Sequence, residues 1–574
     1  MPGFFITNRK EAYSLSELDQ DFDFLHEKIE TKDFLVERNT LKKFLDDKVF
    51  HQDDKYIFIT EGVIYNKIDL LNKYECHNFF DTLKVMYQKN GETYFKDFRG
   101  SFSGACYDKE KKKWILFTNQ IGDHPIYYSY DNDGYLFSTS VEYIAKFKRK
   151  AYDRITLNES ACYDLMTYGF MGSYEGTNTI INEIQRLTAG KYLTYENGEL
   201  TIQTYHRFTT EGQANYSNTE EQAINELDRL FRQAVKREFD KDQEYGYQHL
   251  ASLSGGLDSR MVNWVAKDLG YKNILNMTFS QTGYLDETIS EEISSYLGNE
   301  YLFKSLDDAK FLTEDEFLMC YASSACTYNL LAHSNSMMKY MNFKQFGSLH
   351  TGQLGDVVIG TFIKDGTDEN TGFYSKRLLN KIKREDCTGD KEIELMYKRG
   401  FLGAAASHIL IQNYTEVASP FVDLELFEYC LSIPTSFRKN HSLYKKWIIA
   451  KYPDAADFIW EKSYSKIGAS KFVSLINRAK MKGFKNCFIY ILKKFNHNIV
   501  LKDDKKNMNP FNYWYHHNAE FRNHIDSLRN NTENLTVASN ELIRDIECLF
   551  DQGDTLEKCM AVSVISAIQH YFYN

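Results

Sequence analysis

The sequence is short of proline, of metal-binding cysteine patterns and of long apolar runs. Proline occurs only six times in 574 residues. The ten cysteines form no CxxC pair and no His-flanked pair, so neither a zinc site nor a disulfide scaffold is indicated. No stretch reaches the roughly 18 to 20 uncharged apolar residues of a membrane span, and MPGFFITNRKEAYS lacks the pattern of a signal peptide. We therefore expect reduced cysteines, mostly in cores, and a cytoplasmic protein.

An excess of positive charge is also missing. Lys and Arg total 69 against 80 Asp and Glu, a net charge of -11, which argues against a general nucleic-acid binder. Hydrophobic residues make up 43% and charged residues 26%, a balance that can fill a large core. The length predicts two or three domains.

Residues 1 to about 207 are dominated by short strand-like segments. These segments are rich in β-branched and aromatic residues, and turn residues such as those from Asp131 to Gly134 are typical of hairpins. The segments cover residues 56–60, 62–66, 101–108, 114–119, 125–130 and 134–140. This half is predicted to be mainly β, with helices interspersed.

The hydrophobic period changes near residue 219. From Ala223 to Val235 apolar residues recur at three- and four-residue steps, which predicts an amphipathic helix. Strand-like and helix-like segments then alternate. They cover residues 249–253 (strand), 259–269 (helix), 274–279 (strand) and 287–297 (helix). This alternation predicts a parallel α/β sheet, and the remainder of the chain has a mostly helical pattern.

The segment LSGGLDSR, residues 253–260, lies between the first of these strands and the first helix. Gly255 and Gly256 let backbone N–H groups turn inward, and the following helix presents its positive end, so the loop suits a phosphate group. The Lys of a GxxxxGK[ST] loop is missing, and Asp258 supplies instead a hard oxygen ligand for Mg²⁺. A structural turn with a helix cap is the alternative, but six specified residues at this junction favour a binding loop.

The string SGGLDS resembles the pyrophosphate loop of the ATP-pyrophosphatase superfamily, and residues 1 to about 470 resemble the glutamine-hydrolysing (class B) asparagine synthetase family. Further motifs follow in the family's order: GVIYN (62–66), RGSF (99–102), GDHPIYY (122–128), TGQLGD (351–356) and SPFVD (419–423). The resemblance implies an α/β protein of three parts. These are a degenerate class II glutamine amidotransferase-like domain with an Ntn-hydrolase-like αββα sandwich (1–207), an ATP-pyrophosphatase parallel-sheet domain (208–480) and a helical extension (481–574).

The resemblance also implies a reaction with ATP and Mg²⁺ as cofactors. A carboxylate is adenylated with release of pyrophosphate, and a nitrogen nucleophile displaces AMP. Several residues are assigned to the nucleotide: Ser254, Gly255, Gly256 and Ser259 to pyrophosphate, Asp258 and Asp356 to the metal, and Ser252, Leu253, the Phe279 backbone, Thr351 and Gly352 to adenosine. The last four could equally be ordinary core or turn residues.

A cation is also expected to neutralise the leaving pyrophosphate. In the family it is a Lys six residues before a Gly, and Lys462 with Gly468 meets that spacing. Lys466 is the alternative candidate. Either assignment competes with the simpler interpretation that one lysine in a lysine-rich chain is only a solvated charge. The catalytic set implied by the resemblance is therefore Lys462, Asp258 and Asp356.

The chain departs from the family pattern in both halves. Position 2 is Pro where the family has its Cys nucleophile, Glu61-Gly62 replaces the Asn-Gly of the oxyanion hole, and no RGPD-like segment occurs between residues 30 and 60. These losses predict a domain without glutaminase activity. In the other half Gln353 replaces a Glu proposed to deprotonate ammonia, and Val357 replaces an acidic residue. Gln is no general base, so the nucleophile is expected to be handled differently, as in the related β-lactam synthetases and lasso-peptide cyclases.

Residues 471–506 form a basic and aromatic segment. Ten Lys or Arg stand there against Asp503 and Asp504, interleaved with five aromatic residues. One interpretation is a helix that contacts anionic lipid, a peripheral membrane contact. The alternative, which helical base rates favour, is a helix that packs its aromatic face on a core.

These observations predict an AMP-forming carbon–nitrogen ligase that acts on a small-molecule, glycan or peptide carboxylate. Amidation of a glycan uronate and cyclisation of a peptide are the two leading reactions. The alternative is a non-catalytic ATP-binding scaffold of the same ancestry. A third chemistry, tRNA thiolation or nucleotide amination, would need a sulfur-carrying Cys pair or a basic RNA surface, and neither is evident. The nitrogen donor and the oligomeric state, a homodimer included, stay open.

Overall fold

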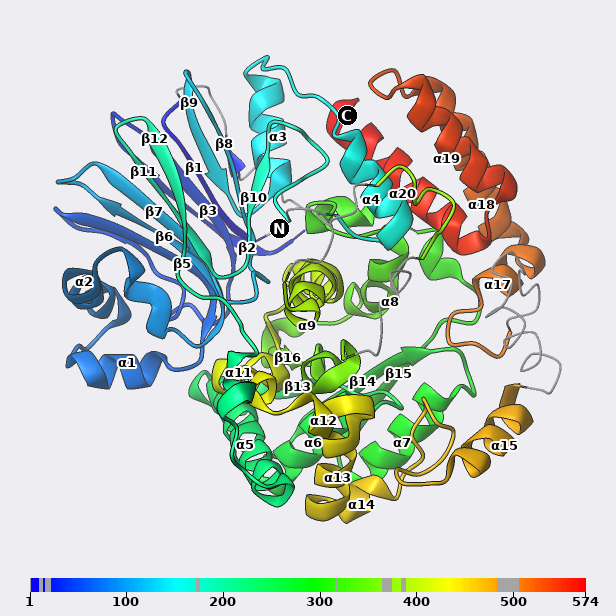
Figure 1. Cartoon of the computed structure of the whole chain (residues 1–574). Coiled ribbons are helices and arrows are strands. Elements are labelled where there is room, and N and C mark those ends of the chain that lie inside the picture. The colour runs from blue at the N-terminus through cyan, green and yellow to red at the C-terminus, as the bar shows by residue number, and fades with distance from the viewer. Residues whose placement is uncertain are drawn as a thin grey trace.

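The computed structural model describes residues 2–9, 14–15, 22–171, 176–314, 317–363, 374–382, 389–482 and 505–573. Within these ranges the chain builds two stacked antiparallel sheets, then a parallel sheet, and finally a layer of helices (Figure 1). We call the part up to residue 207 the N-terminal half and the part from residue 219 onward the C-terminal half.

The N-terminal half is an αββα sandwich, as predicted. One sheet has the order β10-β8-β9-β1-β3-β2 and the other β12-β11-β7-β6-β5-β4. The strands are β1 Gly3–Thr7, β2 Phe24–Glu30, β3 Leu35–Leu41, β4 Phe50–Gln52, β5 Tyr56–Ile64, β6 Gly100–Asp108, β7 Lys113–Thr118, β8 Ile126–Asp131, β9 Gly134–Ser138, β10 Gln185–Leu187, β11 Lys191–Glu196 and β12 Glu199–Thr204. Helices α1 (Lys67–Tyr74) and α2 (Phe79–Asn90) lie outside the sheet that contains β5, and α3 (Val141–Lys150) and α4 (Glu159–Tyr168) belong to the other side (Figure 1).

The alternation of residues along β5 shows why this sandwich forms. Ile57 and Ile59 point into the core between the sheets, whereas Phe58 points outward to the cluster beneath α2. Successive side chains of a strand point to opposite faces. A strand whose residues are apolar on both faces therefore needs cover on both, which the second sheet and α2 supply.

The C-terminal half contains the predicted parallel sheet, in the order β15-β14-β13-β16-β17. Its first elements are α5 Glu220–Glu244, β13 Gln248–Ser252, α6 Asp258–Asp268, β14 Ile274–Ser280, α7 Leu285–Leu297, β15 Glu300–Ser305, α8 Tyr328–Met338, β16 Phe346–His350 and β17 Val417–Ala418. The later helices are α9 Lys391–Leu395, α10 Ala406–Ile411, α11 Leu424–Ser432, α12 Thr435–Arg438, α13 Ser442–Lys451, α14 Pro453–Ala456, α15 Lys471–Lys482, α17 Phe511–His517, α18 Ala519–Arg529, α19 Asn540–Gln552 and α20 Thr555–Phe572. The carboxyl ends of β13 and β16 lie side by side, where open parallel sheets commonly bind ligands.

The last helices share a core with earlier parts of the chain. Val562 and Ile565 of α20 belong to the same buried cluster as Leu165 of α4 and Leu331 of α8. Figure 1 shows α20 lying between α4 and α19. The predicted helical extension is thus packed against both halves.

The basic and aromatic segment is described only in part. Its first helix, α15, leaves the side chains of Phe472 and Leu475 exposed by 71% and 63%. These two side chains are therefore not packed in a core. Residues 483–504, with most of the aromatic residues of the segment, lie outside the described residues.

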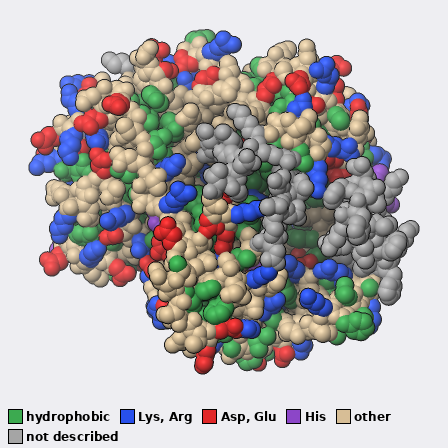
Figure 2. All heavy atoms as spheres, in the orientation of Figure 1, with side chains coloured by type: hydrophobic (Ala, Val, Ile, Leu, Met, Phe, Trp, Pro, Cys, Tyr) green, Lys and Arg blue, Asp and Glu red, His purple; other side chains and the backbone are tan. Residues whose placement is uncertain are grey.

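Other expectations about composition can be compared with the described chain. The eight described cysteines are free, and six of them are buried. Figure 2 shows Lys and Arg side chains interspersed with Asp and Glu over the face in view. Among the described helices, none combines the length and the apolar composition that crossing a bilayer requires.

A short loop of the N-terminal half, residues 42–49, docks into the C-terminal half; we call it the docking loop. Lys48 Nζ lies 2.6 Å from Glu416 Oε1, and both side chains are almost fully buried. Asp47 Oδ2 lies 3.2 Å from Lys241 Nζ on α5. Burial would raise the pKa of Glu416, but Lys48 outweighs it and holds this pKa below the usual value. The two halves are therefore joined by buried charge pairs.

Removing one member of such a pair should be strongly destabilising. We expect Lys48→Met to lower the free energy of unfolding by about 3–5 kcal/mol, because the Glu416 carboxylate loses its nearest cation in a buried site. Lys42→Met, a change in the same loop, breaks the exposed pair with Asp23. It should change the free energy of unfolding by less than about 1 kcal/mol. Urea denaturation of both variants measures the difference, and equal effects would contradict the assignment.

Candidate functional site

The predicted anion loop lies at the carboxyl end of β13, and its donors converge. Ser254 Oγ and Ser259 Oγ are 3.1 Å apart, and the Ser254 N–H donates to Ser259 Oγ at 3.0 Å. The Gly256 N–H donates to Ser254 Oγ at 3.3 Å. These groups gather at the start of α6, the positive end of that helix. The arrangement suits a phosphate group.

Two contacts, one from α7 and one from α6, fix this loop. Asp286 Oδ1 accepts a hydrogen bond from the Gly255 N–H at 2.7 Å. Arg260 is fully buried, and its guanidinium donates to the Gly255 carbonyl at 3.3 Å and to the Ile459 carbonyl at 2.6 Å. Arg260 therefore ties the anion loop to the segment that leads to Lys462.

The second predicted motif, residues 351–356, packs directly against the start of α6. A Cβ on Gly352 would lie 2.3 Å from Ser259 N, and a Cβ on Gly355 would lie 2.6 Å from Asp258 Cγ. Only glycine allows so close an approach. The Asp356 N–H donates to Asp258 Oδ2 at 3.0 Å. The two carboxylates assigned to the metal thus lie side by side, although they are far apart in the sequence.

The surroundings of Asp258 fit a divalent cation. Burial and the charge of Asp356 raise the pKa of Asp258 to about 7. The buried hydroxyl of Tyr444 lies beside this carboxylate and opposes the rise in its pKa. Adjacent carboxylates that disfavour one another's charge are stabilised by Mg²⁺, which prefers oxygen ligands. The donor set therefore fits Mg²⁺.

The two competing lysines lie in different surroundings. Lys466 is exposed and forms an ion pair with Asp457 at 3.0 Å. Lys462 lies close enough to Asp258 to lower the pKa of that carboxylate, and its ammonium group lies 5.9 Å from the centre of the Trp460 ring. Both lysines are exposed, but Lys466 is paired with Asp457, whereas the charge of Lys462 acts on the Asp258 carboxylate.

Three groups near this site were missed in the sequence. They are His441, Tyr444 and Lys445, at the start of α13. Burial, and then the charge of Lys462, lowers the pKa of both His441 and Lys445. Their spacing of three and four residues places them on one side of a helix. That spacing, next to a predicted phosphate site, was the signal that could have found them.

The residues assigned to adenosine contribute mostly through packing and backbone. Ser252 ends β13 partly buried, and Leu253 is buried in the core. The Thr351 hydroxyl donates to a backbone carbonyl at 3.0 Å. The Phe279 ring stacks near that of His333, with the ring centres 6.1 Å apart. Their side chains therefore have structural roles, and their part in nucleotide binding stays a prediction.

In the N-terminal half the position expected for an oxyanion hole holds a carboxylate. Glu61 is buried on β5, and its Oε2 accepts a hydrogen bond from Thr40 Oγ1 at 3.0 Å. Its Oε1 lies 3.5 Å from Arg38 Nη1. Burial raises the pKa of Glu61. Pro2, with neither thiol nor hydroxyl, precedes β1.

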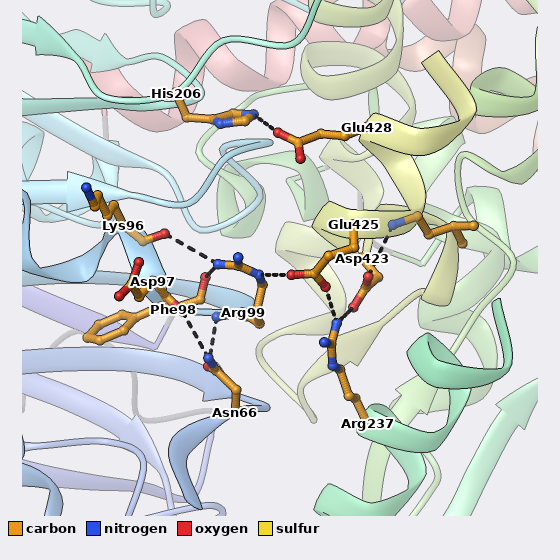
Figure 3. A network of polar contacts seen from close by, with 11 residues as sticks. Asn66, Lys96, Asp97, Phe98, Arg99, His206, Arg237, Asp423, Glu425 and Glu428 are labelled. Carbon is orange, nitrogen blue, oxygen red and sulfur yellow. Dashed lines mark hydrogen bonds and ion pairs between the residues drawn. The ribbon is translucent and has the colours of Figure 1, made fainter. Parts of the chain in front are cut away.

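A polar network joins the two halves close to the SPFVD motif (Figure 3). Arg99 of the N-terminal half donates to Glu425 Oε1 of α11 at 2.7 Å. Arg237 of α5 donates to Asp423 Oδ2 at 2.6 Å and also pairs with Glu425. Arg99 and Arg237 approach Glu425 from opposite sides in this view. The network fixes the carboxylate of Asp423 at the boundary between the halves.

A narrow cavity of about 30 Å³ lies at this boundary; we call it the interdomain cavity. Motif segments from both halves line it, including the position of the missing base, Gln353. Its lining includes Tyr65, Arg99, Ser101, Asp123, Glu238, Gln353, Ser419 and Asp423. The cavity thus connects the amidotransferase-like half with the loop that carries Asp356.

A buried hydrogen-bond chain that no sequence motif indicated lies beside this cavity. Glu238 Oε2 is 3.3 Å from His350 Nδ1, and His350 Nε2 is 2.7 Å from Asp242 Oδ2. The same Asp242 oxygen is 2.9 Å from His249 Nδ1. Asp242, His249 and His350 are spaced closely enough to hold a metal ion, but the distances from the carboxylate to the rings are those of direct hydrogen bonds.

The charges within this chain are strongly shifted. Burial alone would lower the pKa of His350, but Asp242 outweighs it and raises this pKa to about 9. Burial raises the pKa of Glu238 to about 7, although His350 opposes the shift. At neutral pH His350 is therefore a cation between the Asp242 carboxylate and Glu238.

The comparisons with known proteins agree with this geometry. Residues 46–206 match the family described as "Glutamine amidotransferase domain". Asparagine synthetase B [glutamine-hydrolyzing] of Escherichia coli is 23% identical over 269 residues, covering 44% of this chain and 42% of that protein. Putative asparagine synthetase [glutamine-hydrolyzing] 2 of Methanocaldococcus jannaschii is 25% identical over 422 residues, covering 71% and 77%. Asparagine synthetase [glutamine-hydrolyzing] 2 of Bacillus subtilis is 26% identical over 235 residues, covering 37% and 29%.

The similarity of this chain to solved structures is weak. The glutamine phosphoribosylpyrophosphate amidotransferase of Bacillus subtilis is similar with a TM-score of 0.23 and 8% identity, over 52% of this chain and 59% of that one. That TM-score is too low to carry an argument. The match to the E. coli relative spans less than half of that relative's length.

The fold and the site define an amidotransferase-type sandwich joined to a parallel-sheet domain with an anion loop. The match to the Methanocaldococcus jannaschii relative is more specific, because its 422 residues must extend into both halves. The chain is thus similar to glutamine-hydrolysing asparagine synthetases, at low identity to these curated relatives.

The charge of His350 should make stability depend on pH. Because its folded pKa of about 9 exceeds the ordinary 6.5, its contribution is fully present below pH 6.5 and is lost as pH rises to 9. The stabilisation amounts to roughly 3 kcal/mol at pH 6. The free energy of unfolding of wild type and His350→Gln should therefore converge between pH 6.5 and 9 in urea titrations.

The control is His333→Gln. Burial lowers the pKa of His333, so its effect changes with pH only below 6.5. Because its pKa is raised, Glu238 contributes to the pH dependence of stability between about pH 4.5 and 7. The pH dependence at higher pH is therefore assigned to His350. A difference between wild type and His350→Gln that stays constant from pH 6.5 to 9 would contradict the charged state assigned to His350.

Proposed function

We propose that this protein is an ATP-dependent, AMP- and pyrophosphate-forming amide ligase without a glutaminase activity of its own. It adenylates a carboxylate and transfers the acyl group to a nitrogen nucleophile. The observation that carries the proposal is the side-by-side placement of Asp258 and Asp356 at an anion loop, with Lys462 beside them. The carbon–nitrogen ligase class is supported by the relatives, whose names are those of asparagine synthetases.

Each part of this site has a role in the proposed reaction. The serine hydroxyls and N–H groups of the 254–259 loop would hold the pyrophosphate portion of the nucleotide, and Asp258 and Asp356 would hold Mg²⁺. Bound ATP·Mg²⁺ supplies the adenylyl group and neutralises phosphate charge. Lys462 would stabilise the negative charge that develops on the departing pyrophosphate. Lys445 and His441 add further positive charge or hydrogen-bond donors on the same side.

The nitrogen has to come from outside the N-terminal half. Pro2 offers no nucleophile, and Glu61 is an acceptor paired with Arg38 where a donor would be needed. The proposed substrates remain a small-molecule, glycan or peptide carboxylate, in surface-glycan amidation or in peptide and natural-product modification. A cytoplasmic location, the absence of a nucleic-acid partner and membrane contact through residues 471–506 stay predictions.

Exchange between ATP and labelled pyrophosphate tests the adenylation step. With Mg²⁺ and panels of carboxylates, we expect one carboxylate class to support exchange. Asp258→Asn and Lys462→Ala should each lower the rate by about 10²–10³-fold, because the first weakens the binding of Mg²⁺ and the second removes a positive charge, and both cations would stabilise the phosphates. Lys466→Ala, the matched control, should stay within about twofold.

The other outcomes decide between the alternatives. Loss of exchange in Lys466→Ala but not in Lys462→Ala would overturn the assignment of the lysine. Wild-type protein that binds ATP tightly, yet catalyses no exchange with any carboxylate class, would support the non-catalytic scaffold.

Glutamine hydrolysis tests the N-terminal half. Wild-type protein should release no glutamate from glutamine, and Pro2→Cys alone should stay inactive because Glu61 still occupies the oxyanion position. Glutamate release is measured with glutamate dehydrogenase. Activity in the wild type would refute the proposal for this half.

A further inference from the structure

Helix α15 presents its apolar side to solvent. Phe472, Leu475 and Ile476 stand three and four residues apart, so they share one side of the helix. Their side chains are exposed by 71%, 63% and 38%, and that of the neighbouring Val473 by 44%. An amphipathic helix of a globular protein usually turns this side to a core. A contiguous apolar surface of this kind indicates an interaction site.

The polar side of α15 is turned to the protein instead. The Asn477 amide donates to the Tyr464 carbonyl at 3.0 Å. Arg478 donates to the Lys462 carbonyl at 2.8 Å, and its guanidinium lies 5.6 Å from the centre of the Tyr464 ring. Asn477 and Arg478 lie on the opposite side of the helix from the apolar residues, at 100° per residue. These contacts therefore hold α15 with its apolar side outward.

The charges around this apolar side are positive, although the protein as a whole is acidic. Between Glu461 and Asp503 the sequence contains no Asp or Glu. Lys471 and Lys480 of α15 are exposed, and neither forms an ion pair within the described ranges of the chain. On the helix these two lysines flank the apolar residues, one at each border.

These charges favour one occupant over another. A second copy of this chain that docked by the same side would bring the lysines of the two copies together, since a two-fold interface pairs a surface with itself. An anionic lipid surface offers charge of the opposite sign as well as an apolar interior. The apolar and basic residues of α15 are thus complementary to such a surface.

We propose that α15 binds the surface of an anionic lipid bilayer and lies in the plane of that surface. Phe472, Leu475 and Ile476 enter the boundary between headgroups and acyl chains, and Lys471 and Lys480 reach the lipid phosphates. Apolar residues such as Phe and Leu on one side, with basic residues beside them, are typical of helices that lie in a membrane interface. The inference rests on the surface of α15 and is independent of the proposed ligase activity.

This contact would also orient the candidate site. Arg478 ties α15 to the backbone of Lys462, whose charge acts on Asp258. Figure 1 shows α15 at the outer edge of the C-terminal half. A bilayer bound there would lie beside the segment that carries Lys462.

Flotation of the full chain with lipid vesicles tests the proposal. Wild-type protein should float with vesicles that contain phosphatidylglycerol and more weakly with phosphatidylcholine alone. Phe472→Glu should lower the partition coefficient by about tenfold or more, because it places a charge on the apolar side. Tyr340→Glu is the matched control: Tyr340 is also 71% exposed and lies beside Lys304 and Lys339, but outside α15. It should leave the partition coefficient nearly unchanged.

The lysines are tested in the same assay. Lys471→Gln and Lys480→Gln should each lower partitioning into phosphatidylglycerol vesicles by about fivefold, because each removes one positive charge near the anionic surface. Lys272→Gln, a change of an exposed lysine outside α15, is the control and should bind as wild type does. Added salt should weaken the binding of wild type, because it screens the same attraction.

Several results would overturn the proposal. These are wild-type protein that does not float with phosphatidylglycerol vesicles, and Phe472→Glu that floats as well as wild type. A dimer in sedimentation velocity that is lost in Phe472→Glu, without vesicle binding, would assign the apolar side of α15 to a second copy instead. Flotation requires no substrate, so this inference and the ligase function, which pyrophosphate exchange tests, can fail separately.

Discussion

The buried charge pairs between the two halves are the constraint on which the rest of the site depends. Lys48 with Glu416 and Asp47 with Lys241 take charged groups out of water, which is favourable only when their partners are held in place. That requirement fixes how the sandwich sits on the parallel sheet. The interdomain cavity exists because this placement leaves a narrow space, and its walls are set by the same contacts.

Local motifs made part of the site predictable from the sequence. The anion loop needs a strand, two glycines and a helix in immediate succession, so residues 253–260 carried enough information by themselves. The spacing of Lys462 to Gly468 favours it over Lys466, and the charge of Lys462 acts on Asp258. The sheets were predictable for a similar reason, because alternation along a strand and the alternation of strands with helices are short-range patterns.

The remaining groups depend on long-range packing, which spacing alone does not reveal. Glu238, Asp242 and His350 come from a helix and a strand more than 100 residues apart. None of them belongs to a motif in its own segment of the sequence. Glu61 shows the same limit, since its pairing with Arg38 follows from two sheets facing one another. At this position the fold pairs a buried carboxylate with a buried guanidinium.

The core shared by α4, α8 and α20 has a consequence for how this protein can change over evolution. Its apolar side chains come from the beginning, the middle and the end of the chain, so deleting the N-terminal half would expose the core that the C-terminal helices need. The N-terminal half is therefore needed for packing, apart from any chemistry that it carries. Splitting the gene into two independent proteins would therefore expose this shared core. New substrate preferences have to arise by substitution at the cavity and in the loops around it.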